Sequence, residues 1–270
     1  MRARPAPGLT GVLPALAALL MIGVLAVPLV ALVASTTPAD LIDGLRHPLA
    51  LAALRLSVVT TTLSLALTLL LGTPLAWWMA RHPSRLERAV STLVQLPIVV
   101  PPAVSGLALL LAFGRRGLLG PLLERAGWTL PFTTAAVVLA ELFVSAPFYI
   151  QSAAAAFRRL DEDLLWVSRS LGAGPARRFF SVALPLSRPG LVTGAALGWA
   201  RALGEFGATL MFAGNLTGRT QTLPLAVYTA LETDLRPARA LSVLMVAVAL
   251  GVLLLVGRGT VEVEAIRARP

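Results

Sequence analysis

The sequence contains no cysteine and no lysine, and it has only 2 histidines among its 270 residues. Without cysteine the chain forms neither a disulfide framework nor a thiolate metal site. Without lysine it has no phosphate-binding loop of the GxxxxGK[ST] type, so any nucleotide hydrolysis that drives this protein belongs to another polypeptide. Neither an HExxH nor a GxSxG string occurs, which argues against an intramembrane hydrolase.

Charge is also scarce: 13% of the residues are charged and 57% are hydrophobic, with a mean hydropathy of +0.81. This is more apolar material than the core of one soluble domain of this length needs, so the composition predicts an all-helical integral membrane protein whose solvent is the lipid bilayer. The net charge of +10 comes from arginines that lie in short clusters between apolar runs. Such clusters set orientation in a membrane, so we expect no nucleic-acid partner.

The first apolar run is long enough to cross a hydrocarbon core of about 30 Å, and with five further apolar runs it predicts six membrane spans. We expect the first to be a retained helix rather than a signal peptide, whose apolar region is usually about 7 to 15 residues. Trp77 and Trp78 close the second span, where an interfacial aromatic belt is expected. Residues 36–48 and 114–131 are read as loops, and a short helix is expected at 223–232. The spans are residues 12–33, 51–79, 89–113, 132–157, 190–212 and 241–256.

Arginine counts predict the orientation, because cytoplasmic segments hold the excess of positive charge. With both termini inside, 14 arginines are internal and 8 are external. His47 and His82 then lie on opposite sides of the membrane, so no metal site is expected. The internal set is Arg2, Arg4, Arg81, Arg85, Arg88, Arg158, Arg159, Arg169, Arg177, Arg178, Arg188, Arg258, Arg267 and Arg269. The external set is Arg46, Arg55, Arg115, Arg116, Arg125, Arg219, Arg236 and Arg239.

The third span is interrupted by Pro97, Pro101 and Pro102, followed by Ser105 and Gly106. Backbone broken at membrane depth survives only where protein or a water-filled cavity satisfies its freed groups. The prolines therefore indicate either a segment that faces a pathway or a simple packing kink.

The fifth span carries small residues every four positions, at Gly190, Gly194, Gly198 and Ala202, which form a stripe for close helix packing. Arg201 and Glu205 are also four apart, at a depth of about 16 to 23 Å from Gly190. Ionisable groups at such depth are paired or face an aqueous cavity, so both a helix-locking ion pair and a place on a pathway wall are open. For Glu141, in the fourth span, we expect a partner on another helix.

The polar segment between the fourth and fifth spans carries LGAGPARRFFSVALP, residues 171–185. One short helix ending near Gly172 and a second over 176–182 are expected to form an L-shaped element. Asp161, Glu162 and Asp163 suit the start of the first helix, where the dipole favours negative charge. Gly172 and Gly174 allow the turn. Pro185 and Pro189 are expected to mark the junction with the fifth span, because proline lacks the donor that a helix interior needs.

Gly172, nine residues and then Val182-Ala183-Leu184-Pro185 fit the cytoplasmic signature written EAA, three residues, G, nine residues, I-x-L-P. The chain thereby resembles the permease subunits of type I ABC importers. It departs from the signature at Trp166, Val167 and Ser168, which stand where Glu-Ala-Ala is expected, so a coupling role of that glutamate does not carry over. The resemblance implies that residues 158–188, here named the coupling segment, contact a separate ATPase.

Four further strings look like the molybdate branch of this superfamily: QLPIVVPPAVSG, LLLAFGRRGLLG, RALGEFGATLMFAGN and GRTQTLPLAVY. Sulfate and thiosulfate permeases carry similar strings and are the nearest alternative; a proton-coupled secondary transporter is a third. The resemblance implies molybdate uptake, with tungstate as a further candidate, in the plasma membrane. It also implies two copies of this permease, two copies of the ATPase and an external oxyanion-binding protein. ATP and Mg are expected on the ATPase, and this chain is expected to bind no cofactor and to be no enzyme itself.

The resemblance divides the chain into residues 1–50, with the first span, a permease domain over 51–257 and a short cytoplasmic tail over 258–270.

A doubly negative oxyanion avoids carboxylates, so Glu141 and Glu205 are not expected as its ligands. Phe206 or Phe212 is expected to plug a narrow point, since a hydrophobic constriction closes a pore by dewetting. The predicted ATPase-coupling residues are Asp161, Leu171, Gly172, Ala173, Arg177, Phe179, Phe180, Leu184 and Pro185. The predicted pathway or gate residues are Pro97, Pro101, Pro102, Ser105, Arg201, Glu205, Phe206, Thr209, Phe212 and Asn215.

Overall fold

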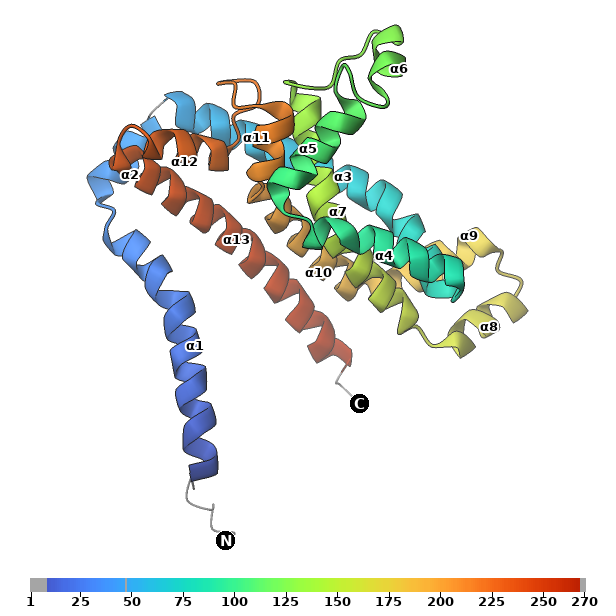
Figure 1. The fold of residues 1–270 in the computed structure, drawn as a ribbon. Helices are drawn as coiled ribbons and strands as arrows, with labels where there is room; N and C mark the ends of the chain where they lie inside the picture. Colours follow the sequence, from blue (N-terminus) through green and yellow to red (C-terminus); the bar gives the residue numbers. More distant parts are fainter. Residues whose placement is uncertain (1–8, 47, 268–270) are drawn as a thin grey trace.

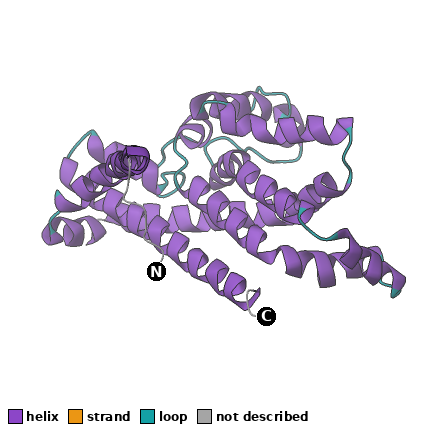
Figure 2. Cartoon of the chain, turned by 90° about the horizontal axis from the view of Figure 1, so that it is seen from below, coloured by secondary structure: helices purple, strands orange, loops and turns teal. Residues whose placement is uncertain are grey.

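The computed structural model of the chain describes residues 9–46 and 48–267. Predictions that concern Arg2, Arg4, His47 and Arg269 lie outside the described residues, as do those that need the side chains of Arg258 and Arg267. Over the described ranges the chain is helical and contains no strand, as Figure 2 shows. This confirms the all-helical class that the composition predicts.

The helices follow one another with short connections (Figure 1). They are α1 (Leu9–Ala34), α2 (Pro38–Arg46), α3 (Pro48–Arg81), α4 (Arg85–Val99), α5 (Pro102–Phe113), α6 (Gly120–Arg125), α7 (Thr134–Arg158), α8 (Glu162–Ser170), α9 (Pro175–Arg178), the π-helical turn η1 (Phe179–Ala183), α10 (Leu184–Leu203), α11 (Gly207–Ala213), α12 (Leu223–Leu231) and α13 (Leu235–Arg267).

Four described helices are long and apolar enough to cross a membrane, and they lie in α1, α3, α7 and α13. The pair α4 and α5 makes a fifth if it counts as one broken span, with a bend of 117° between its halves. The predicted fifth span, residues 190–212, is divided between α10 and α11. The count of six spans is therefore not confirmed by this structure, and the orientation of the termini stays a prediction.

Helix α7 is the centre of the fold. Half of the residues in its most apolar stretch are buried, and it packs against α3, α10, α11 and α4. At one of its ends Tyr149 and Phe157 pack against Ala76 and Met79 of α3, and near the other Val137 packs against Phe212 of α11. The elements around both ends of α7 are thus held by one helix.

Helix α1 stands apart from the rest of the molecule in Figure 1, and no residue of its most apolar stretch is buried inside the subunit. Its C-terminal end is attached to α13, because the Arg239 guanidinium donates to the Ser35 carbonyl oxygen over 2.6 Å. Such an apolar surface needs lipid or another protein around it.

Two helices were missed in segments that the sequence analysis reads as loops. Helix α2 begins with a reciprocal cap, in which the Thr37 amide donates to the Asp40 carboxylate and the Asp40 amide donates to the Thr37 hydroxyl, each over 3.1 Å. This capping pattern is visible in the sequence and is a signal for a helix start. Helix α6 is only 6 residues long and starts with Gly120 and Pro121.

Candidate functional site

The coupling segment starts with α8, whose N-terminus is capped as the sequence predicts. The Asp161 carboxylate accepts from the Asp163 amide over 2.9 Å, and Glu162 and Asp163 occupy the first turn. The helix ends at Ser170, and Gly172 follows with a φ of +81°. Left-handed backbone of this kind suits glycine, so the predicted turn at Gly172 is confirmed. Gly174 has no positive φ, so the turn needs only one of the two glycines.

The outer surface of the coupling segment is apolar to an unusual degree. Leu171 is 80% exposed, Phe180 64% and Trp166 60%, and the neighbouring Leu164 and Val167 are exposed as well. Clustered large apolar side chains on a surface indicate a contact with another protein or with a membrane. The segment therefore has the surface that a docking element needs.

The two adjacent phenylalanines of this segment have different places. The Phe179 ring packs against the rings of Trp77 and Phe157, with centroids 5.4 Å and 6.0 Å away. Phe179 thus anchors the segment to α3 and α7, whereas Phe180 points outward. Of the other predicted coupling residues, Arg177 and Pro185 are exposed, and Ala173 and Leu184 are half-buried.

The predicted junction at Pro185 and Pro189 is wrong, because the chain stays helical from Pro175 to Leu203. The helix widens into the π-turn η1 just before Pro185, where the Leu184 amide donates to the Phe179 carbonyl five residues earlier. A proline ring clashes with the carbonyl four residues before it, and a π-turn relieves that conflict without ending the helix. The coupling segment and the start of the fifth predicted span are therefore one continuous helical rod.

The proline-rich interruption of the third predicted span is confirmed. Helix α4 ends at Val99, Pro101 caps α5 and Pro102 is its first residue. Proline is favoured at a helix start because its missing N–H has no partner there anyway. Pro97 lies inside α4 and does not end it.

A second break separates α10 from α11 at Gly204, Glu205 and Phe206. The Glu205 carboxylate, 1% exposed, accepts from the Ala208 amide over 2.8 Å and lies 2.7 Å from the Arg201 guanidinium. It therefore pairs with the last turn of α10 and caps the first turn of α11 at the same time. Of the two alternatives left open for these residues, the i,i+4 ion pair is present, and a place on a pathway wall stays a prediction. The structure adds the contact with Ala208, which the spacing alone did not indicate.

The two broken helices pack against each other. A Cβ atom at Gly106 of α5 would lie 2.7 Å from the Met211 Cβ of α11, and one at Gly207 of α11 would lie 2.9 Å from the Pro102 Cβ of α5. Only glycine permits this approach at both positions. The interruption that the prolines predict and the one at Glu205 thus form one contact region inside the subunit.

Several predicted pathway residues are buried in this region. Ser105, Thr209 and Phe212 are completely buried, and the Phe212 ring lies 6.5 Å from that of Phe113. Within the subunit these three are core residues, so their place on a pathway wall stays a prediction. Asn215 is half-buried, and its amide donates to the Thr229 hydroxyl over 2.9 Å.

Phe206 has a different environment from Phe212. Its ring lies 5.2 Å from that of Tyr228, and both line an open hollow of about 400 Å³ with Val227, Met245 and Val246. The hollow is apolar and lies between the α10–α11 break, α12 and α13. Of the two phenylalanines predicted as a plug, Phe206 is the one at a surface.

The glycine stripe of the fifth predicted span is a packing face, as predicted, and the helix that it contacts is α7. A Cβ at Gly190 would lie 2.6 Å from the Ala156 Cβ, and one at Gly194 would lie 2.7 Å from the Ser152 Cβ. Gly198 also faces α7, but less tightly: a Cβ there would lie 3.6 Å from the Ser145 carbonyl oxygen. The rod that carries the coupling segment is therefore held closely along α7.

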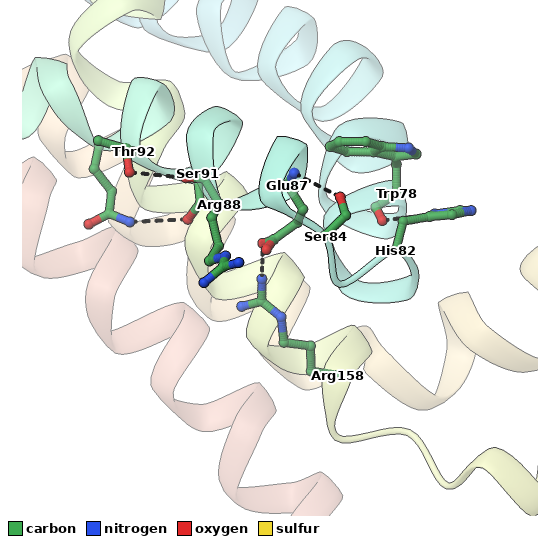
Figure 3. Close-up of polar contacts among 9 residues, drawn as sticks. Trp78, His82, Ser84, Glu87, Arg88, Ser91, Thr92 and Arg158 are labelled. Carbon is green, nitrogen blue, oxygen red and sulfur yellow. Dashed lines mark hydrogen bonds and ion pairs between the residues drawn. The ribbon is translucent and has the colours of Figure 1, made fainter.

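Two polar contacts join helices that the sequence does not show as neighbours. The Thr60 hydroxyl of α3 donates to the buried Glu141 carboxylate of α7 over 2.9 Å, which supplies the partner expected on another helix. The Arg158 guanidinium at the end of α7 donates to the Glu87 carboxylate of α4 over 2.7 Å (Figure 3). Figure 3 also shows Ser84, whose hydroxyl accepts from the Glu87 amide and caps α4. Glu87 was missed, although the Ser84-x-x-Glu87 spacing is a capping-box signal.

Residues 72–263 match the family model of the binding-protein-dependent transport system inner membrane component. The molybdenum transport system permease protein ModB of Mycobacterium tuberculosis is 46% identical over 92% of this chain and 93% of its own length. The ModB protein of Escherichia coli K12 is 36% identical over 74% of this chain and 88% of its own length. This chain belongs to that family of importer membrane subunits, in the branch of the molybdenum transport permeases.

Solved structures agree with the fold of this family. A bacterial ABC transporter involved in the import of the acidic polysaccharide alginate aligns with a TM-score of 0.71 at 15% identity, over 92% of this chain and 93% of that one. The inward-facing MetNI methionine transporter aligns with a TM-score of 0.63 at 20% identity, over 80% of this chain and 96% of that one. These structures thus support the ABC importer fold, and the family match with the apolar helices supports a multi-pass inner-membrane permease subunit.

Proposed function

We propose that this chain is the membrane subunit of an ATP-driven importer of molybdate, and that it couples to a separate ATPase through residues 160–188. The relatives that align with 92% of this chain are named molybdenum transport system permease proteins. The observation that carries the coupling proposal is the exposed apolar surface of the coupling segment around Trp166, Leu171 and Phe180.

In this proposal a second polypeptide hydrolyses the ATP that drives transport. The chain contains no lysine for a phosphate-binding loop, so ATP and Mg bind to the ATPase and not to this subunit. Two ATPase subunits closing on each other would push the coupling segments. The continuous rod from Pro175 to Leu203 carries that push to the break at Glu205. Helix α11, which follows the break, lies against α5.

The translocation pathway needs a second copy of this chain in our proposal. The exposed apolar hollow around Phe206, Tyr228 and Met245 supports a homodimer, because such a surface at membrane depth fits a second apolar protein face. Phe206 then lies at the boundary between the two copies, where a hydrophobic ring can act as a gate by dewetting.

An external oxyanion-binding protein delivers the substrate in this scheme. A relative in fold was crystallised in complex with a periplasmic protein. In our chain an open hollow of about 490 Å³ lies at the α7 end opposite the coupling segment, lined by Arg115, Thr133 and Arg219. The two arginines make no ion pair among the described residues, so the hollow suits an acidic surface of the binding protein.

Co-purification with the ATPase tests the coupling surface. The chain offers a matched pair of exposed tryptophans at opposite ends of the molecule: Trp166 at 60% exposure in the coupling segment and Trp128 at 66% before α7. We expect Trp166→Ala to reduce the amount of ATPase that co-purifies with the permease and Trp128→Ala to leave it unchanged. Equal recovery with both variants would refute docking through this surface.

Competition in reconstituted vesicles tests the substrate. We expect unlabelled molybdate to compete with labelled molybdate for uptake, and tungstate to compete as well because it is also a tetrahedral dianion. Strong competition by sulfate with none by tungstate would favour a sulfate permease instead.

A further inference from the structure

Three arginines line one small cavity between the end of α3, α8 and α9. They are Arg81 of α3, Arg169 of α8 and Arg178 of α9, and the cavity of about 210 Å³ is completed by Glu162, Leu165 and Trp166. Three guanidinium groups and one carboxylate leave a formal charge of +2 around it. A volume of this size is about that of seven water molecules at about 30 Å³ each, which fits a small anion with part of its hydration shell.

Arg81 is held rigidly at the wall of this cavity. Its guanidinium lies 4.8 Å from the centroid of the Trp77 ring and donates to the Phe157 carbonyl oxygen over 3.2 Å. A cation over an aromatic face and a fixed acceptor together orient the planar group. The charge of Arg81 is therefore positioned by α3 and α7, independently of the cavity.

Glu162 neutralises Arg81 only weakly. The shortest distance between the two side chains is 3.7 Å, and the Glu162 side chain is 79% exposed. Charge-assisted hydrogen bonds of full strength join nitrogen and oxygen at about 2.7 to 2.9 Å. An exposed pair at the longer distance is screened by water, so the cavity keeps its positive character.

Two of the three arginines are partly enclosed by protein. The Nε atoms of Arg81 and Arg178 have no hydrogen-bond partner within the described part of the chain, although neither is accessible to solvent. Arg169 completes the set, with its guanidinium 5.6 Å from the Trp166 ring centroid. The ligand contacts are therefore assigned to the remaining guanidinium nitrogens of the three arginines, whose positive charges surround the hollow with only one carboxylate beside them.

We infer that this cavity is a binding site for a tetrahedral oxyanion, separate from the translocation pathway. A dianion matches the formal charge, and its four oxygens accept from guanidinium groups on three different elements. A free sulfate-like or phosphate-like ion offers this chemistry in full, and the phosphodiester of an anionic lipid headgroup offers it with one negative charge and two free oxygens. Either one would join the coupling segment to the end of α3.

Sulfate binding to the purified full-length chain in detergent, without ATPase or ATP, tests the site by equilibrium dialysis. We expect saturable binding that Arg178→Gln weakens about tenfold or more, as the loss of one charged contact does. The matched control is Arg177→Gln, which changes the exposed neighbour that does not line the cavity and leaves binding unchanged. Arg178→Lys keeps the charge and should bind more tightly than Arg178→Gln.

A second variant guards against misfolding. Arg169 is exposed, so Arg169→Gln should leave the fold intact and still weaken sulfate binding. Hydrogen exchange gives an independent signal: sulfate should slow exchange of the α8 amides in the unmodified chain and not in Arg169→Gln. Binding that is the same in the unmodified chain, Arg169→Gln and Arg178→Gln would place the anion elsewhere and overturn the proposal, as would no binding at all.

Bilayer discs distinguish the two sources of the anion. With phosphatidylcholine alone, whose phosphate is neutralised by its own choline cation, sulfate should bind as in detergent. If lipid phosphate is the ligand, added phosphatidylglycerol should weaken sulfate binding in the unmodified chain; if the ligand is free, it should not. Because the ATPase takes no part, loss of ATP-driven uptake with intact sulfate binding would count against the proposed function and not against this site.

Discussion

Glu205 is the residue at which one substitution tests the geometry of the broken helix. Its carboxylate lies 2.7 Å from the Arg201 guanidinium and accepts from the Ala208 amide over 2.8 Å. Glu205→Ala removes both contacts, whereas Glu205→Gln keeps an acceptor for the amide and removes only the charge. The two variants therefore separate the ion pair from the helix cap.

The expected magnitudes follow from burial. Removing one partner of a fully buried ion pair costs about 3 to 5 kcal/mol. The Arg201 side chain is 28% exposed, so water compensates part of the loss, and we expect about 2 kcal/mol for Glu205→Gln. Loss of a helix cap adds about 1 kcal/mol, which gives about 3 kcal/mol for Glu205→Ala.

The assay is unfolding of the full chain by sodium dodecyl sulfate in mixed micelles, followed by tryptophan fluorescence. Combining Glu205→Gln with Arg201→Met removes both charges and should recover part of the stability that Glu205→Gln loses, because no uncompensated charge is left. If both Glu205 variants unfold within about 0.5 kcal/mol of the unmodified chain, the carboxylate does not join the two helices.

Three further outcomes follow from single positions. Gly194→Ala should destabilise the chain, because its Cβ would lie 2.7 Å from a side chain of α7, and Gly251→Ala should not, since nothing lies within 4 Å of its Cβ; thermal unfolding compares them. Gly172→Ala should strain the left-handed turn by about 1 to 2 kcal/mol and reduce ATP-coupled uptake, whereas Gly174→Ala, equally open but without positive φ, serves as its control and should transport normally. Hydrogen bonds from its capping threonine lower the pKa of Asp40 below the usual 3.8. The cap therefore stabilises α2 above that value and loses this contribution as the pH falls through the lower folded pKa. The α2 amides should then exchange faster once Asp40 is protonated, relative to the amides of α12, which has no acidic residue in its first turn, at the same pH.

Local chemistry explains what could be predicted from the sequence. The glycine at 172, the acids at 161–163 and the prolines at 101 and 102 each act on their own backbone, so their effects are visible in a linear pattern. The i,i+4 spacing of Arg201 and Glu205 likewise specifies a contact within a few residues. The resemblance drawn from the coupling segment and from strings such as RALGEFGATLMFAGN identified the family correctly.

Contacts between distant segments could not be predicted in the same way. That Phe179 faces inward and Phe180 outward depends on where Trp77 and Phe157 lie, and neither is near them in the sequence. The helix continues through Pro185 because a π-turn precedes this proline, and no residue pattern at 179–183 predicts that turn. The pairing of Glu87 with Arg158 and the meeting of Arg81 with Arg169 and Arg178 likewise depend on how α3, α4, α7 and the coupling segment pack.

The central claim is that a separate ATPase drives molybdate through this subunit. Its most direct test is molybdate uptake into vesicles that contain the permease, the ATPase and the external binding protein. Our account predicts uptake that stops when ATP is removed or the ATPase is left out, and that continues when a protonophore collapses the proton gradient. Uptake that survives without ATP but ends with the proton gradient would contradict the account and identify a secondary transporter.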